Sequence, residues 1–213
     1  MFKRVIHAED AEGFSSVEAV REYAAHAEKS MLKYEAFFSE LEKLGIGQGR
    51  LLDVGAGPGV LAAAVAARYP AAHITALELS DNMIAAGREY IAGKGMADRV
   101  MYVAGNAADV AALADLGPFD VVYSTFTLHH FADPQAVIRN LLPVVDAGGA
   151  LFLYDLRRAW WLYWVPSRSG FCRSVRGAYT RRDVLALLDE MGLSGYSVRN
   201  VVPFLLSAVI KKP

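Results

Sequence analysis

The feature that most limits what this chain can fold into is a short apolar run that leads into three closely spaced glycines. Residues 51–54, Leu-Leu-Asp-Val, are typical of a strand in the middle of a parallel sheet. Gly55, Gly57 and Gly59 then allow a sharp turn with no side chain between the backbone and a ligand. A helix predicted over residues 60–68 would direct its free N–H groups at that turn. Such a corner favours a nucleotide-like ligand at the carboxyl end of a sheet strand.

The glycine spacing separates two classes of ligand. The dinucleotide pattern G-x-G-x-x-G requires a glycine at position 60, but this chain has Val60 and its third glycine is Gly59. The spacing therefore disfavours NAD, and an NAD-dependent oxidoreductase stays as an alternative. A strand–turn–helix corner that binds no ligand also remains open.

Residues 53–59, Asp-Val-Gly-Ala-Gly-Pro-Gly, closely resemble the first motif of class I S-adenosylmethionine-dependent methyltransferases. The resemblance implies transfer of a methyl group from S-adenosylmethionine to an acceptor, with S-adenosylhomocysteine as product. It also implies that Asp53, Gly55, Ala56 and Gly57 bind the cofactor.

A second strand, predicted over residues 73–78, ends in an acid. Glu78 lies about 20 residues beyond the turn, where a carboxylate can accept hydrogen bonds from both ribose hydroxyls. Leu79 would lie beside the adenine, and Met83 would pack on the adenine face from the first turn of the next helix, which Ser80 or Asp81 caps. The alternative for Glu78 is a solvated strand end.

The third predicted strand begins at residue 99 and leaves the sheet at Asn106 and Ala107. The resembled family usually has an acid at the position of Asn106, where it binds the adenine amino group. An asparagine oxygen can still accept from that group. A turn role, with Asn106 capping a helix over residues 107–113, is the equal alternative.

The fourth strand and its exit, residues 119–131, resemble the fourth motif of small-molecule methyltransferases, including a Leu-His-His sequence. The resemblance places Ser124 and Thr125 against the cofactor through their backbones. It places Phe126 and His129 at the reacting centre. His129 is a candidate general base, and a packing histidine is the alternative. Adjacent histidines seldom point the same way and no cluster at ligand spacing accompanies them, so no metal site is predicted.

Residues 1–45 are predicted to form an N-terminal helical cap, with helices over residues 15–29 and 31–44. In the resembled family such helices close over the cofactor. Tyr23 and Tyr34 are therefore candidate cofactor contacts, with core packing as the alternative.

The rest of the chain completes an α/β fold. A fifth strand is predicted over residues 150–154, a helix starts at the capping box Thr180–Asp183, and strands over residues 196–201 and 204–210 suit a hairpin. Residues 46–213 are thus predicted to form a doubly wound, mostly parallel seven-stranded sheet with a C-terminal antiparallel hairpin, Rossmann-like as in the resembled family.

One segment is unusual in composition. Residues 156–182 hold seven of the 22 basic residues and none of the 23 acidic residues, interleaved with aromatic side chains. We interpret the segment as a substrate lid in which Trp160, Arg173 and Arg176 bind an anionic or aromatic acceptor. A peripheral membrane contact and an exposed charged helix are the alternatives. No RNA-binding motif appears, so no nucleic-acid partner is expected.

The composition, 54% hydrophobic and 21% charged over 213 residues, suits one globular α/β domain. A single cysteine, Cys172, excludes an internal disulfide, and with no signal-like N-terminus it predicts a cytoplasmic location. The motifs together predict a methyltransferase acting on a small molecule. A non-catalytic protein that binds the cofactor, and uses the arginine-rich segment for membrane or partner binding, is a further alternative.

Overall fold

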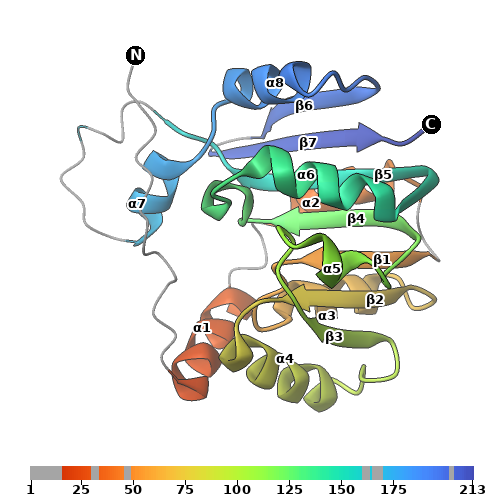
Figure 1. Cartoon of the computed structure of the whole chain (residues 1–213). Helices are drawn as coiled ribbons and strands as arrows, with labels where there is room; N and C mark the ends of the chain where they lie inside the picture. The colour runs from red at the N-terminus through yellow and green to blue at the C-terminus, as the bar shows by residue number, and fades with distance from the viewer. Residues whose placement is uncertain (1–15, 30–33, 46–48, 160–163, 165–169, 202–203) are drawn as a thin grey trace.

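The computed structural model describes residues 16–29, 34–45, 49–159, 164, 170–201 and 204–213, and a seven-stranded sheet lies at its centre (Figure 1). The strands run in the order β3-β2-β1-β4-β5-β7-β6. Their bounds are β1 Arg50–Val54, β2 His73–Glu78, β3 Val100–Ala104, β4 Phe119–Thr125, β5 Val145–Leu156, β6 Tyr196–Val201 and β7 Leu205–Lys211. Strands β1 to β5 pair in parallel, whereas β7 is antiparallel to both β5 and β6. The predicted fold, including the hairpin at one edge, is confirmed.

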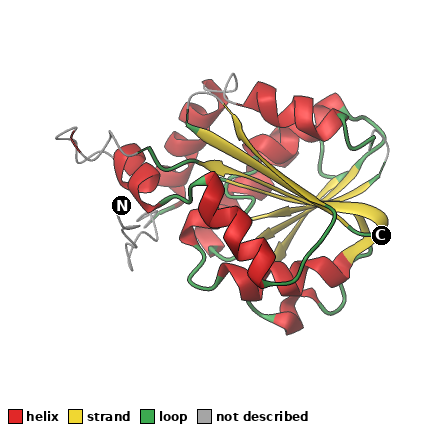
Figure 2. Cartoon of the chain, turned by 90° about the horizontal axis from the view of Figure 1, so that it is seen from above, coloured by secondary structure: helices red, strands yellow, loops and turns green. Residues whose placement is uncertain are grey.

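Helices cover both faces of the sheet, as Figure 2 shows from above. Helices α2, α3 and α4 pack on one face, and α6 and α8 pack on the other. Helix α1 lies against α3 and α4, and α7 lies near the carboxyl end of β4. The helices are α1 Val17–Lys29, α2 Glu35–Glu42, α3 Val60–Arg68, α4 Asp81–Gly93, α5 Val110–Leu113, α6 Pro134–Leu141, α7 Gly170–Gly177 and α8 Arg181–Glu190. This layering is the doubly wound arrangement expected of alternating strands and helices.

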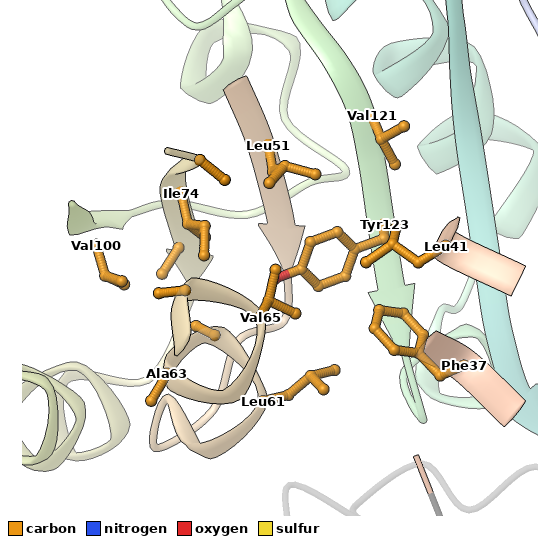
Figure 3. Packing of buried hydrophobic residues seen from close by; sticks show 14 of the residues in the cluster. Phe37, Leu41, Leu51, Leu61, Ala63, Val65, Ile74, Val100, Val121 and Tyr123 are labelled. Carbon is orange, nitrogen blue, oxygen red and sulfur yellow. The ribbon is translucent and has the colours of Figure 1, made fainter. Parts of the chain in front are cut away.

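Strand alternation divides the core into two halves. Leu51 faces the α2–α3 side, where it joins Phe37, Leu61 and Tyr123 in the packing that Figure 3 shows. Leu52 and its equivalents on neighbouring strands face the other side, under α6 and α8. Because side chains alternate along a strand, Asp53 points to the same side as Leu51. A carboxylate is thereby placed in an apolar layer, at the point where β1 ends.

Several boundaries differ from the sequence-based expectation. The hydroxyl of Ser16 caps α1 by accepting from the N–H of Ala19 (3.2 Å). The α5 helix begins at Val110 and is capped by Asp109, so the expected start at residue 107 was wrong. Strand β5 begins five residues earlier than expected, because Val145 already pairs with Phe119 of β4. Its pairing with β7 begins only at Ala150. The capping box at Thr180 and Asp183 is present as predicted. None of the described helices is long and apolar enough to cross a bilayer.

Candidate functional site

The glycine turn after β1 has a backbone that only glycine adopts easily. Gly55, Gly57 and Gly59 all have positive φ, at 73°, 54° and 78°. A side chain at Gly55 would collide with Thr127, and one at Gly59 would collide with the Tyr102 hydroxyl. At Gly57, however, nothing lies within 4 Å of the position that a Cβ would take. The turn is therefore packed at both ends and open in the middle, where a ligand can approach the backbone.

Glu78 is held beside this open position. One carboxylate oxygen accepts from the Gly57 N–H at 2.8 Å. The other accepts from the N–H groups of Leu79 (2.9 Å) and Ser80 (3.0 Å). Ser80 caps α4 by accepting from the N–H of Met83. The carboxylate is thus fixed in orientation at the carboxyl end of β2, next to a Leu79 side chain that is 67% exposed.

Sequence reasoning missed Tyr102, a residue of β3 whose hydroxyl bonds to the glycine turn. Its hydroxyl donates to the carbonyl of Gly57 at 2.8 Å, so both the N–H and the C=O of Gly57 are hydrogen-bonded. The hydroxyl reaches the turn only because Gly59 and Gly87 lack side chains, since a Cβ at Gly87 would lie 2.2 Å from it. Burial raises the pKa of Tyr102, and the charges of Asp53 and Glu78 add to the rise, so the hydroxyl stays a donor.

Asp53 is a buried acid at the end of β1 and is 1% exposed. Neither of its oxygens has a hydrogen-bond partner among the described residues. Burial raises its pKa to about 7, and the charge of Glu78 adds to the rise. Tyr123, its cross-strand neighbour on β4, offsets only part of that rise, because its hydroxyl does not reach hydrogen-bond geometry. A buried acid of this kind suits a cationic ligand group such as an ammonium.

Asn106 and Ala107 follow β3. The side-chain oxygen of Asn106 accepts from the N–H of Ala108 at 2.9 Å, which is the turn role expected as one alternative. Asn106 is exposed and Ala107 is buried. The proposed contact of Asn106 with an adenine amino group stays a prediction.

The loop after β4 packs against the glycine turn. The Ser124 hydroxyl donates to the carbonyl of Val54 (2.9 Å), and Thr127 lies close to Gly55. Between them, Phe126 has a positive φ of 55°, which is uncommon for a residue with a side chain. Its N–H donates to the carbonyl of Tyr154 at 2.9 Å. The strained backbone aims the Phe126 ring at the junction of the sheet, α2 and α7.

His129 and Asp155 form a buried pair at the same edge of the sheet. Nδ1 of His129 lies 2.7 Å from one oxygen of Asp155, and the backbone N–H of His129 donates to the other at 2.8 Å. The two side chains are 5% and 2% exposed. Sequence reasoning named His129 but missed Asp155. An acid that ends a parallel strand, the signal that identified Glu78, would have found it.

The two candidate tyrosines differ in burial. Tyr34 is buried and packs edge-on against Phe126, with ring centroids 5.7 Å apart. Burial raises the pKa of Tyr34, and the charges of Tyr23, Asp53 and Tyr154 add to the rise, so these groups share one neighbourhood. Tyr23, on α1, is 41% exposed. Ion pairs from Arg21 to Glu89 and from Lys94 to Glu28, both 2.6 Å, attach α1 to α4.

The arginine-rich segment divides into structural and exposed residues. Arg158 is buried and pairs with Asp183 at 2.7 Å, so it joins the segment to α8. Cys172 packs with Val175 on the buried side of α7. Arg173 is exposed and Arg176 is half-buried on α7. Trp160, another candidate acceptor contact, lies outside the described residues.

The described residues fit an adenosyl cofactor. The open turn at Gly57, the oriented carboxylate of Glu78 and the partnerless acid Asp53 offer a backbone approach, acceptors for ribose hydroxyls and a counter-ion for an amino group. Among the described part of the chain, no group of three or more His, Cys, Asp or Glu side chains could hold a metal ion.

Comparison with known proteins identifies a matching domain and related methyltransferases. Residues 52–153 match a family described as a methyltransferase domain. Relatives include a demethylmenaquinone methyltransferase of Clavibacter sepedonicus, 34% identical over 160 residues that cover 69% of this chain and 62% of the relative. Another is a ubiquinone biosynthesis O-methyltransferase of Xanthomonas euvesicatoria pv. vesicatoria, 34% identical over 116 residues that cover 54% of this chain and 46% of the relative. The chain spans between 26% and 62% of the length of the first curated relatives it matches.

Solved structures carry the same fold. A SAM-dependent methyltransferase from Aquifex aeolicus superposes with a TM-score of 0.72 at 16% identity, covering 90% of this chain and 97% of that one. The plantazolicin methyltransferase BpumL in complex with SAH superposes with a TM-score of 0.71 at 13% identity, covering 96% and 92%. At these identities the likeness concerns the fold alone. The domain match, the motif residues and this fold together support a class I S-adenosylmethionine-dependent methyltransferase.

Proposed function

We propose that this protein transfers the methyl group of S-adenosylmethionine to a small molecule bound over the carboxyl ends of β4 and β5. The observation that carries the proposal is the Glu78 carboxylate, fixed by three backbone N–H groups beside the open backbone of Gly57. A neutral or basic residue there would offer no such pair of acceptors to two neighbouring hydroxyls.

The remaining cofactor contacts follow from position. We assign the ribose to Glu78, the adenine face to Leu79 and Met83, and the amino group to Asp53. The backbone contacts are assigned to Gly55, Ala56, Gly57, Asn106, Ala107, Ser124 and Thr125. Tyr34 would border the methionine end, since the charge of Asp53 contributes to the raised pKa of Tyr34, and Tyr23, another contributor, is assigned beside it.

The acceptor site is assigned to the junction of α2, β5 and α7. Phe126, Tyr34 and Tyr154 gather there with edge-on ring contacts of 5.7 and 6.0 Å. Aromatic faces suit a planar acceptor and also favour a positive sulfur. Relatives named for quinone biosynthesis support a ring-bearing acceptor. Arg173 and Arg176 on α7, with Trp160, would bind an acidic substituent or an aromatic part of it.

Little chemistry is demanded of the protein itself. When bound, S-adenosylmethionine supplies a methyl group already activated by its sulfonium. The side chains therefore act by placing the acceptor in line and by excluding water. The largely apolar surroundings of Phe126 would serve both purposes.

Calorimetry with S-adenosylhomocysteine tests the assignment. Glu78→Ala should raise Kd by about 100-fold, because two hydrogen bonds to a charged group are lost. Asp98→Ala is the matched control, since Asp98 is an exposed acid that follows α4 and has no assigned role. Its Kd should equal that of the wild type. Unchanged affinity in Glu78→Ala would discard the site, and an NADH titration of the same samples would reveal the alternative oxidoreductase.

A further inference from the structure

The loop that follows β3 is held by hydrogen bonds from two neighbouring elements. The N–H of Gly105 donates to the carbonyl of Glu78 at 2.9 Å, which attaches the start of the loop to the end of β2. From α6, the side-chain NH₂ group of Asn140 donates to the carbonyls of Ala107 (3.3 Å) and Ala108 (2.9 Å). A loop fixed at both ends presents the side chain between them in a defined direction.

That side chain is Asn106, and its amide oxygen is turned into the loop. The oxygen lies 2.9 Å from the backbone nitrogen of Ala108. A backbone N–H can only donate, so the atom that meets it must be the amide oxygen and not the NH₂ group. The NH₂ group is on the other branch of the planar amide and is therefore directed away from the turn. Asn106 is exposed, and the described residues offer this NH₂ group no acceptor.

Asn106 lies close to the position proposed for the ribose. Glu78 of β2 is the register partner of Ala104 of β3, and Asn106 follows two residues later. Neighbouring strands are about 4.8 Å apart. Glu78 and Asn106 thus belong to the proposed cofactor end of the site, whereas His129 and Asp155, near the carboxyl ends of β4 and β5, belong to the proposed acceptor end.

This placement selects one edge of the base. A ribose bound at Glu78 carries its adenine through N9. The edge of the ring system that is farthest from the sugar bears N1 and the 6-amino group, whereas N3 and N7 lie nearer to the sugar. A side chain one strand beyond Glu78 can therefore meet the far edge, where N1 is an acceptor and the amino group is a donor.

We propose that Asn106 recognises the adenine of S-adenosylmethionine by donating its NH₂ group to N1, and not by accepting from the 6-amino group. The proposal rests on the function proposed above and deepens it, because it names the atom of the base that determines affinity. An NH₂ group can only donate, so it can bond to N1 but not to another amino group. An acid at this position would select the 6-amino group instead.

Two analogues of S-adenosylhomocysteine separate the two contacts. The 1-deaza analogue has C–H in place of N1, and the purine analogue lacks the 6-amino group. Calorimetry with the wild type should give a Kd about tenfold higher for the 1-deaza analogue than for S-adenosylhomocysteine, because one hydrogen bond is lost. The purine analogue keeps N1, so its Kd should lie within about threefold of that for S-adenosylhomocysteine.

Asn106→Asp should reverse this order. The substitution replaces only the NH₂ group, and the remaining oxygen can still accept from Ala108 and keep the turn. The new oxygen is repelled by the lone pair of N1 and accepts from the amino group. The purine analogue should then bind about tenfold or more weakly than S-adenosylhomocysteine, and the 1-deaza analogue within about threefold of it. Asn200→Asp is the matched control, since it makes the same change at an exposed position of β6, at the opposite edge of the sheet, and should keep the wild-type ratios.

Two results would overturn the proposal. One is a wild type that loses more affinity with the purine analogue than with the 1-deaza analogue, a result that needs no variant to fold. The other is Asn106→Asp with the wild-type ratios, since N1 would then be met by the backbone of the loop and not by this side chain. Failure of the wild type to bind S-adenosylhomocysteine would instead refute the proposed function, so the two failures are distinguishable.

Discussion

Two buried acids lie near the carboxyl ends of β1 and β5, and they differ in their hydrogen bonding. Asp155 on β5 is 2% exposed and accepts from His129 and Leu156. Asp53 on β1 is 1% exposed, and no described residue donates to it. A buried carboxylate without donors is costly. The contrast shows that the protein itself supplies the hydrogen bonds of Asp155, whereas the described residues supply none to Asp53, which supports our proposal that a ligand group meets Asp53.

The largest expected effect concerns Asp53 and the pH dependence of stability. Its folded pKa is about 7 against 3.8 in the unfolded chain, so the folded state keeps a proton that the unfolded state has released. Stability of the ligand-free protein should therefore fall as pH rises from about 4 to 7, by about 4 kcal/mol. Asp53→Asn removes this titration, so the decline should flatten. Urea unfolding at pH 4 to 8 measures it.

The same titration tests the contrast with Asp155. Asp155→Asn places an NH₂ group where backbone N–H groups now donate, so it should destabilise the protein at neutral pH by about 2 kcal/mol. Asp53→Asn should instead be at least as stable as wild type there. If both variants lost stability equally at pH 8, the idea that Asp53 awaits a ligand would have to be abandoned.

The next effect concerns the open backbone at Gly57. Gly57→Val puts a branched side chain at a φ of 54° and into the space where a ligand approaches. S-adenosylhomocysteine affinity should fall by about 100-fold or more, roughly 3 kcal/mol, as calorimetry would show. Gly95→Val is the matched control, because Gly95 also has a positive φ and open space but follows α4. It should lose comparable stability and no affinity. Retained affinity in Gly57→Val would contradict the assigned approach.

The two ends of the site also differ in how far the sequence could predict them. The cofactor end is built from short-range signals, namely a glycine turn at residues 55–59 and an acid at residue 78 with a cap behind it. The acceptor end depends on pairings across 26 residues, from His129 to Asp155, and no local pattern specifies such a partner. Periodicity predicted the sheet and the hairpin, because apolar residues recur along each element. The exact ends of elements, such as the starts of α5 and β5, depend on single residues and were not predicted.

Tyr102 lay beyond local prediction as well, since a tyrosine in a strand usually indicates core packing. Its role follows only from the two glycines, 59 and 87, that let the hydroxyl through to the Gly57 carbonyl. The proposed cofactor end therefore also depends on a contact between residues distant in sequence, from Tyr102 to Gly57, which limits the contrast between the two ends.

Tyr102→Phe should give the smallest effect of the series. The change removes one hydrogen bond at 2.8 Å and leaves the ring in place, so stability should fall by about 1 kcal/mol. Gly57 then keeps only the hydrogen bond from its N–H to Glu78, because its carbonyl has lost the Tyr102 donor. The Kd for S-adenosylhomocysteine should therefore rise about fivefold. Tyr196→Phe is the control, because its hydroxyl donates to Asp189 at the far edge of the sheet and should affect stability without affecting binding. Equal affinities in the two variants would mean that Glu78 suffices to position the turn, and that the cofactor end is as local as its motif.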